Sequence, residues 1–148
     1  MAELKSLPSE KESGCLINPR ILVVDDNRDA AHTLTRLLNL IGYSASEAHD
    51  GASAITFIEG HSPILVLLDL SMPGMDGIET AKRIRQMPQF DHVQLVALSG
   101  HERPEDIART QAAGFATHLV KPVNLSVLER LLIEMVGMPS ETKRSSPR

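Results

Sequence analysis

The chain has 148 residues, 42% of them hydrophobic, which is enough for one domain with a real core and leaves little room for a second. Its net charge of −4 hides an asymmetry: residues 1–20 are neutral and residues 139–148 carry +2, so residues 21–138 carry −6. An acidic domain with three Phe, one Tyr and no Trp lacks the basic surface and aromatic platforms of nucleic-acid-binding proteins, so we expect no nucleic-acid partner.

The two ends of the chain differ in composition from the middle. Residues 1–19 and 139–148 are rich in polar residues and Pro without an apolar period, so we expect disordered tails around one domain at residues 20–138. No apolar stretch reaches the roughly 20 residues of a membrane span, and the N-terminus lacks the apolar core of a secretory signal. The single cysteine, Cys15, cannot form an internal disulfide. We therefore expect a cytoplasmic protein that does not associate with membranes.

The domain begins with an apolar run, residues 21–24, which has no alternation and suits a parallel strand buried on both faces. A helix follows, with Asn27 placed to cap its first turn and Gly42 to end it. Its predicted buried face comprises Ala30, Leu34, Leu37, Leu38 and Ile41. Residues 44–48 are then predicted to form a short second strand.

A second helix opens at Asp50-Gly51 and is predicted to end at Gly60. Its inward residues are predicted to be Ala54, Ile55 and Ile58. The apolar run at residues 64–68 predicts a third strand, which Asp69 closes, and Pro and Gly make residues 71–74 a loop. A third helix is predicted over residues 76–87, with Ile78, Ala81 and Ile84 facing inward.

Residues 93–98 predict the fourth strand, and Pro104 suits the first turn of a fourth helix that ends near Gly114. This helix offers only Ile107, Ala108, Ala112 and Ala113 for packing, so we expect it to be the least firmly held element. Residues 116–120 predict the fifth strand, and Asn124 caps an amphipathic last helix. Its predicted buried side comprises Leu125, Leu128, Leu131, Leu132 and Met135. Five strands alternating with five helices predict an α/β fold with a doubly wound parallel sheet.

Polar residues follow four of these strands: Asp25 and Asp26 the first, Asp69 the third, Ser99 the fourth and Lys121 the fifth. In a doubly wound sheet the carboxyl ends of the strands surround one crevice, so we expect these side chains to meet. Three carboxylates need a cation, and their hard oxygens suit Mg²⁺. A hydroxyl and an ammonium beside them would hold the oxygens of a phosphoryl group transferred to a carboxylate.

Taken singly, each of these residues has a simpler structural interpretation. Asp25-Asp26 would serve as a helix N-cap pair, Asp69 as a strand-end cap, Ser99 as the start of a turn and Lys121 as a solvated charge. Their joint placement at strand ends favours a shared functional site over these separate structural roles.

The ordered motifs resemble the receiver domains of bacterial two-component response regulators over about residues 20–137. The motifs are ILVVDDN at 21–27, GY at 42–43, DG at 50–51, LDLSMPGMDG at 68–77, LSG at 98–100 and HLVKP at 118–122. The resemblance implies a flavodoxin-like sheet with strand order 2-1-3-4-5. It also implies a chain that is not an enzyme on other substrates, although it catalyses its own phosphorylation and dephosphorylation.

By this resemblance Asp69 is the phosphoacceptor. Asp26 and Asp69 are direct Mg²⁺ ligands, Asp25 holds metal-bound waters, and the backbone carbonyl of Ser71 completes the protein ligands. Ser99, Lys121 and His118 are implied to bind the phosphoryl group or to switch with it. The resemblance also implies a cis peptide bond at Lys121-Pro122.

The implied phosphoryl donor is a phosphohistidine on a histidine kinase or a histidine phosphotransfer protein. After transfer, the surface formed by the fourth helix, fifth strand and fifth helix changes its preference for a partner. Three features depart from the commonest pattern: His118 replaces Tyr or Phe, Gly100 replaces Ala, and Ser71 and His101 occupy variable positions beside the phosphoryl group.

The sequence leaves three classes of function open. The chain is a stand-alone receiver or the receiver part of a hybrid histidine kinase; or it is a protein-interaction module that binds a partner without phosphorylation. The third class, an aspartate-nucleophile phosphatase or a flavin-binding protein, is disfavoured, because Ser71 stands where such phosphatases carry a second Asp and no phosphate-binding loop follows the first strand.

Overall fold

The computed structural model describes residues 20–100 and 104–138, so the predicted tails lie outside the described residues, as do Cys15 and His101. The elements in chain order are β1 (Arg20–Val24), α1 (Arg28–Leu40), β2 (Ser44–Ala48), α2 (Gly51–His61), β3 (Leu65–Asp69), α3 (Gly77–Arg85), the 3-10 helix η2 (Pro88–Phe90), β4 (Gln94–Ser99), α4 (Pro104–Ala112), β5 (Thr117–Val120) and α5 (Leu125–Met135).

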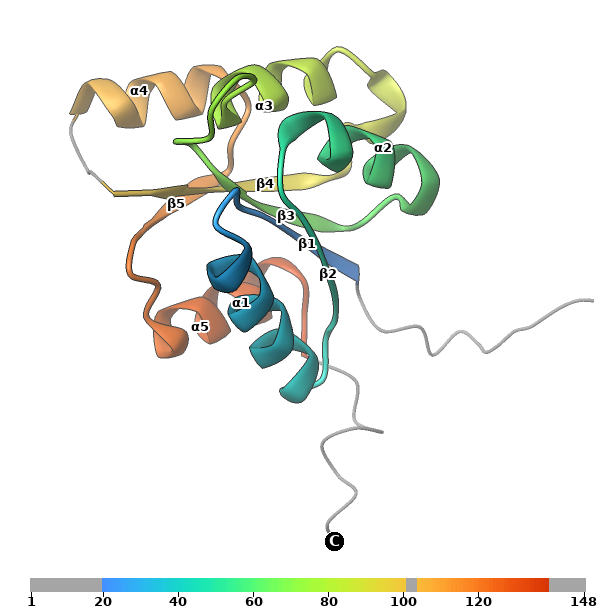
Figure 1. Ribbon diagram of the computed structural model, residues 1–148, viewed down its shortest axis with the longest axis vertical. Coiled ribbons are helices and arrows are strands. Elements are labelled where there is room, and N and C mark those ends of the chain that lie inside the picture. The colour runs from blue at the N-terminus through green and yellow to red at the C-terminus, as the bar shows by residue number, and fades with distance from the viewer. Residues whose placement is uncertain (1–19, 101–103, 139–148) are drawn as a thin grey trace, which may run out of the picture.

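The five strands form one parallel sheet in the order β2-β1-β3-β4-β5, as predicted. Helices α1 and α5 cover one face, and α2, α3 and α4 cover the other (Figure 1). Alternate residues of each central strand point to opposite faces, so Leu22 and Val24 join one buried cluster and Ile21 and Val23 the other. Burial on both faces explains why the central strands lack a polar alternation.

Within residues 20–100 and 104–138, four helices begin with a described side-chain cap. Asn27, Asp50, Asp76 and Asn124 each adopt an extended conformation and accept a hydrogen bond from the backbone N–H three residues later. The predicted caps at Asn27 and Asn124 and the start of α2 after Asp50 are therefore confirmed.

Two predicted helix ends are wrong, and proline explains both. Helix α2 continues through Gly60 to His61, and Ser62 in a left-handed conformation (φ 49°) precedes Pro63. Helix α3 ends at Arg85, because Met87 precedes Pro88 and takes up the extended conformation that proline imposes on its predecessor.

Some predicted helix faces are also wrong. Ala30 is exposed, whereas Ala31 and Thr35 are buried; in α4, Ala108 and Ala112 are exposed and Thr110 is buried. Leu125, at the start of α5, is exposed as well. Alanine carries little hydrophobic signal and threonine is polar by type, so a shift of one or two residues in the buried face leaves no trace in the apolar pattern.

Candidate functional site

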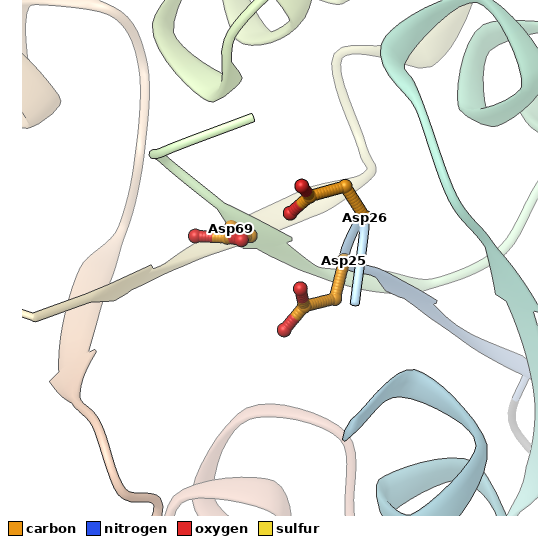
Figure 2. Close-up of side chains that lie close together, drawn as sticks. All are labelled: Asp25, Asp26 and Asp69. Carbon is orange, nitrogen blue, oxygen red and sulfur yellow. The ribbon is translucent and has the colours of Figure 1, made fainter. Parts of the chain in front are cut away.

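Three carboxylates lie together where β1 and β3 end (Figure 2). The strands are neighbours with Val24 opposite Leu68, so Asp25 and Asp69 follow side by side, and Asp26 comes next in the loop. One oxygen from each of the three lies within 4.8 Å of the others. Asp25 and Asp69 are buried and Asp26 is exposed, so the cluster is open to solvent on one side.

Lys121 joins the cluster from the last strand of the sheet. It follows β5, and its Nζ lies 3.2 Å from Oδ2 of Asp25 and 3.2 Å from Oδ2 of Asp69. Burial lowers the pKa of Lys121, but the charges and hydrogen bonds of Asp69 and Asp25 outweigh burial and raise the pKa above its ordinary value. The ammonium is therefore firmly protonated between the two carboxylates.

Backbone donors orient the two buried carboxylates. Oδ1 of Asp69 accepts from the N–H of Ser71 at 3.0 Å, and Oδ1 of Asp25 accepts from the N–H of Asn27 at 2.9 Å. Burial nevertheless raises the pKa of Asp69, and the nearby charge of Asp25 adds to this, against the lowering by Ser71 N–H and Lys121. Three carboxylates share the one ammonium of Lys121, so the cluster has a net negative charge, which suits a hard divalent cation.

Ser99 and His118 lie on the neighbouring strands. Asp69 pairs with Leu98 in the sheet, so Ser99 is buried one residue beyond that pair, and it lines a cavity of about 190 Å³ with Ser71 and Gly100. His118 is half-buried on β5, three residues before Lys121, and faces the α4 side because Leu119 packs on the α1 and α5 side. The Lys121-Pro122 peptide bond is cis.

Gly77 supports the site, a role that the sequence analysis did not assign. A Cβ at this position would lie 2.5 Å from the carbonyl oxygen of Asp69 and 2.8 Å from Cα of Leu70. The start of α3 thus packs directly on the backbone of Asp69, and only glycine leaves room for it. The motif contained Gly77, but its packing partner lies eight residues away and could not be seen in the sequence.

None of the helices within residues 20–100 and 104–138 is both long and apolar enough to cross a bilayer.

Residues 21–133 match the family model of the response regulator receiver domain. The chain is 31% identical over 110 residues to sporulation initiation phosphotransferase F of Bacillus subtilis, which covers 74% of this chain and 87% of that protein. It is 35% identical to the response regulator MprA of Mycobacterium avium over 84% of this chain, and 33% identical to the autoinducer sensor kinase/phosphatase CqsS of Vibrio cholerae over 74%. The chain spans 52% of MprA and 16% of CqsS.

Two solved structures show the same fold. The chemotaxis protein CheY4 of Vibrio cholerae has a TM-score of 0.77 at 27% identity, covering 80% of this chain and 99% of CheY4. The receiver domain of Ssk1 from Saccharomyces cerevisiae, solved with the histidine phosphotransfer protein Ypd1, has a TM-score of 0.75 at 27% identity, covering 80% and 89%. The family model, the relatives and the acid cluster agree, and the chain belongs to the response regulator receiver domain family of two-component systems.

Proposed function

We propose that the chain takes a phosphoryl group from a phosphohistidine donor onto Asp69 in the presence of Mg²⁺. The observation that carries this proposal is the gathering of Asp25, Asp26 and Asp69 within 4.8 Å around an ammonium that contacts two of them. Asp25, Asp26, Asp69 and the backbone carbonyl of Ser71 would hold the metal, whose charge stabilises the phosphoryl oxygens during transfer.

The residues of the chain have distinct roles in this step. A carboxylate oxygen of Asp69 attacks phosphorus and forms the O–P bond, while the P–N bond of the donor breaks and its imidazole leaves with the electron pair and takes up a proton. Ser71 N–H orients the nucleophile from 3.0 Å. Lys121 shifts from the carboxylates to a phosphoryl oxygen, and the hydroxyl of Ser99 donates to another. The chemistry is confined to transfer onto Asp69 and later hydrolysis of that acyl phosphate.

The donor is a histidine kinase or a histidine phosphotransfer protein. A groove of about 700 Å³ beside Asp25 supports this, since it runs between α1 and the turn after β5 and is lined by apolar side chains such as Leu34 and Val123. It offers space for a helix next to the acid cluster. The Ssk1 receiver, which shares this fold, was solved with such a phosphotransfer protein.

After transfer, the surface of α4, β5 and α5 changes its affinity for a downstream protein. Val120 of β5 and Val127 of α5 are exposed by 38% and 47%, which supports an apolar contact there. Movement of Ser99 toward the phosphoryl group, with inward rotation of His118 on β5, would link Asp69 to this surface.

Incubation with acetyl phosphate and Mg²⁺, followed by intact mass measurement, tests the chemistry. We expect one hydroxylamine-sensitive phosphoryl group on the wild type and none on Asp69→Asn. Asp91→Asn is a matched control, because Asp91 is exposed and precedes β4 at the opposite end of that strand from Ser99. Undiminished labelling of Asp69→Asn would refute the assignment. Equal partner affinity with and without the phosphoryl group would instead favour the interaction module that needs no phosphorylation.

A further inference from the structure

Helix α4 is held unevenly along its length. None of residues 105–109 is buried, whereas Thr110 is 4% exposed and Ala113, just after the helix, is 3% exposed. Phe115 follows, is buried in the same cluster as Ala113, and donates its backbone N–H to the carbonyl of Thr110. The packing that holds α4 is therefore concentrated at its C-terminal end.

Arg85 of α3 reinforces this end. Its Nε and Nη2 donate to the carbonyl oxygen of Gly114 at 3.3 and 3.1 Å, while Nη2 also donates to Val93 at 2.7 Å and Nη1 to Phe90 at 3.2 Å. One guanidinium thus joins α3, the segment before β4 and the turn after α4. Such charged hydrogen bonds to several carbonyls fix a backbone more firmly than a single contact.

Gly114 is shaped for this contact. Its φ is +100°, a conformation that L side chains rarely adopt, and a Cβ there would lie 2.8 Å from Cγ and from Nε of Arg85. The turn therefore rests directly on the arginine side chain.

The other end of α4 borders a cavity. The cavity of about 190 Å³ that Ser71, Ser99 and Gly100 line is also lined by Asp106 and Arg109 of α4. The N-terminal half of α4 thus has room to move beside the phosphorylation site, and its C-terminal end does not.

We propose that Arg85 is a positioning residue for the switch: by fixing the turn at Gly114, it makes α4 pivot about its C-terminal end, so that phosphorylation displaces only the N-terminal half. This inference rests on the proposed phosphorylation of Asp69. The movement of Ser99 displaces the half of α4 that borders the cavity. The displacement does not extend to Thr110 and Ala113, which are held by packing and by the contacts of Arg85.

Amide chemical shifts of the full-length, ¹⁵N-labelled protein test the pivot, with Mg²⁺ present and beryllofluoride as the phosphoryl mimic. In the wild type we expect shift changes at Ser99 and over residues 105–109 that are several-fold larger than those at residues 110–114. Arg85→Lys keeps the charge but has no planar fork with which to contact three separate carbonyls, so we expect its changes to extend through Gly114. Arg83→Lys is the control, because Arg83 is exposed on the same helix and pairs with Glu79 rather than with Gly114.

Each outcome has a distinct meaning. No response to beryllofluoride anywhere near Asp69 would overturn the proposed function itself. A wild-type response as large at residues 110–114 as at residues 105–109 would overturn the pivot alone, as would an Arg85→Lys profile identical to that of the wild type. If Arg85→Lys does not fold, the wild-type shift changes still decide whether α4 pivots about its C-terminal end. Hydrogen exchange of the amides at Ala113 and Phe115 gives a second test, because we expect these amides to remain protected when the mimic binds.

Discussion

Asp69 is the residue at which stability and function oppose each other. Burial of the Asp69 carboxyl raises its pKa, and the nearby charge of Asp25 raises it further. The N–H of Ser71 and the ammonium of Lys121 lower the pKa, but by less than these two effects raise it. The folded protein therefore binds a proton at Asp69 more tightly than the unfolded chain does. The free energy of unfolding consequently falls as the pH rises from the ordinary pKa of 3.8 through the raised one.

Replacement of Asp69 by Asn should therefore stabilise the metal-free protein at neutral pH. The amide has nearly the same shape, retains an oxygen for Ser71 N–H, and carries no charge to bury. Urea denaturation in EDTA at pH 7 measures the gain, and the fall in stability with pH above 3.8 should be smaller in the variant. If the variant were less stable than the wild type under these conditions, the cost of burying the Asp69 charge would not exceed the stabilisation that Ser71 N–H and Lys121 give it.

At the scale of elements, each helix cap makes its own contribution to the free energy of unfolding. Asp50 accepts a hydrogen bond from the N–H of Ser53 at 2.7 Å at the start of α2, and this bond lowers the pKa of Asp50. We expect Asp50→Ala to lower the free energy of unfolding by about 1 kcal/mol at pH 7. Because the pKa is lowered, the contribution of the cap is complete above pH 3.8 and is lost as the pH falls through the lowered pKa.

Urea denaturation at pH 7 and again in acid measures this cap. Ala52, which is exposed two residues after Asp50, offers a control: Ala52→Ser adds a hydroxyl to the same turn without removing the cap. If the loss of unfolding free energy caused by Asp50→Ala became larger as the pH falls, the result would be inconsistent with an ionised cap.

Two glycines in helices should respond in opposite directions to alanine. At Gly60, near the end of α2, an added Cβ meets nothing within 4 Å, so Gly60→Ala should raise the free energy of unfolding by about 0.5–1 kcal/mol. At Gly77 the Cβ would collide with backbone atoms of Asp69 and Leu70, so Gly77→Ala should lower it by roughly 1–3 kcal/mol. Thermal denaturation of both variants compares them, and equal effects would refute the close approach of α3 to β3.

At the scale of the whole molecule, the site exists only because four loops meet at one edge of the sheet. Bound Mg²⁺ should therefore stabilise the fold as a unit, by roughly 2.7 kcal/mol when the metal is a hundredfold above its dissociation constant. Denaturation with and without Mg²⁺ measures this gain. Asp26→Asn should abolish most of it, whereas Asp29→Asn, on the exposed first turn of α1, should leave it intact. Equal gains in the two variants would count against the acid cluster as the metal site.

The sequence predicts an element well where a single local interaction determines it. Uninterrupted apolar runs predict the central strands because these are buried on both faces, and Asn or Asp at a cap predicts helix starts because the hydrogen bond spans only three residues. The predicted end of α2 is wrong because glycine permits a helix end without requiring one, whereas Pro63 enforces it.

The sequence by itself determined the order of strands and helices along the chain and the polar residues that follow four of the strands, because both depend on neighbours along the chain. Only the tertiary structure decided which residues touch: Lys121 lies between Asp25 and Asp69, Gly77 packs against the backbone of Asp69, and Arg85 contacts the backbone of Gly114. These contacts join residues 8 to 96 positions apart. Their distances depend on how the sheet twists and how the helices pack on it, and no local pattern encodes that.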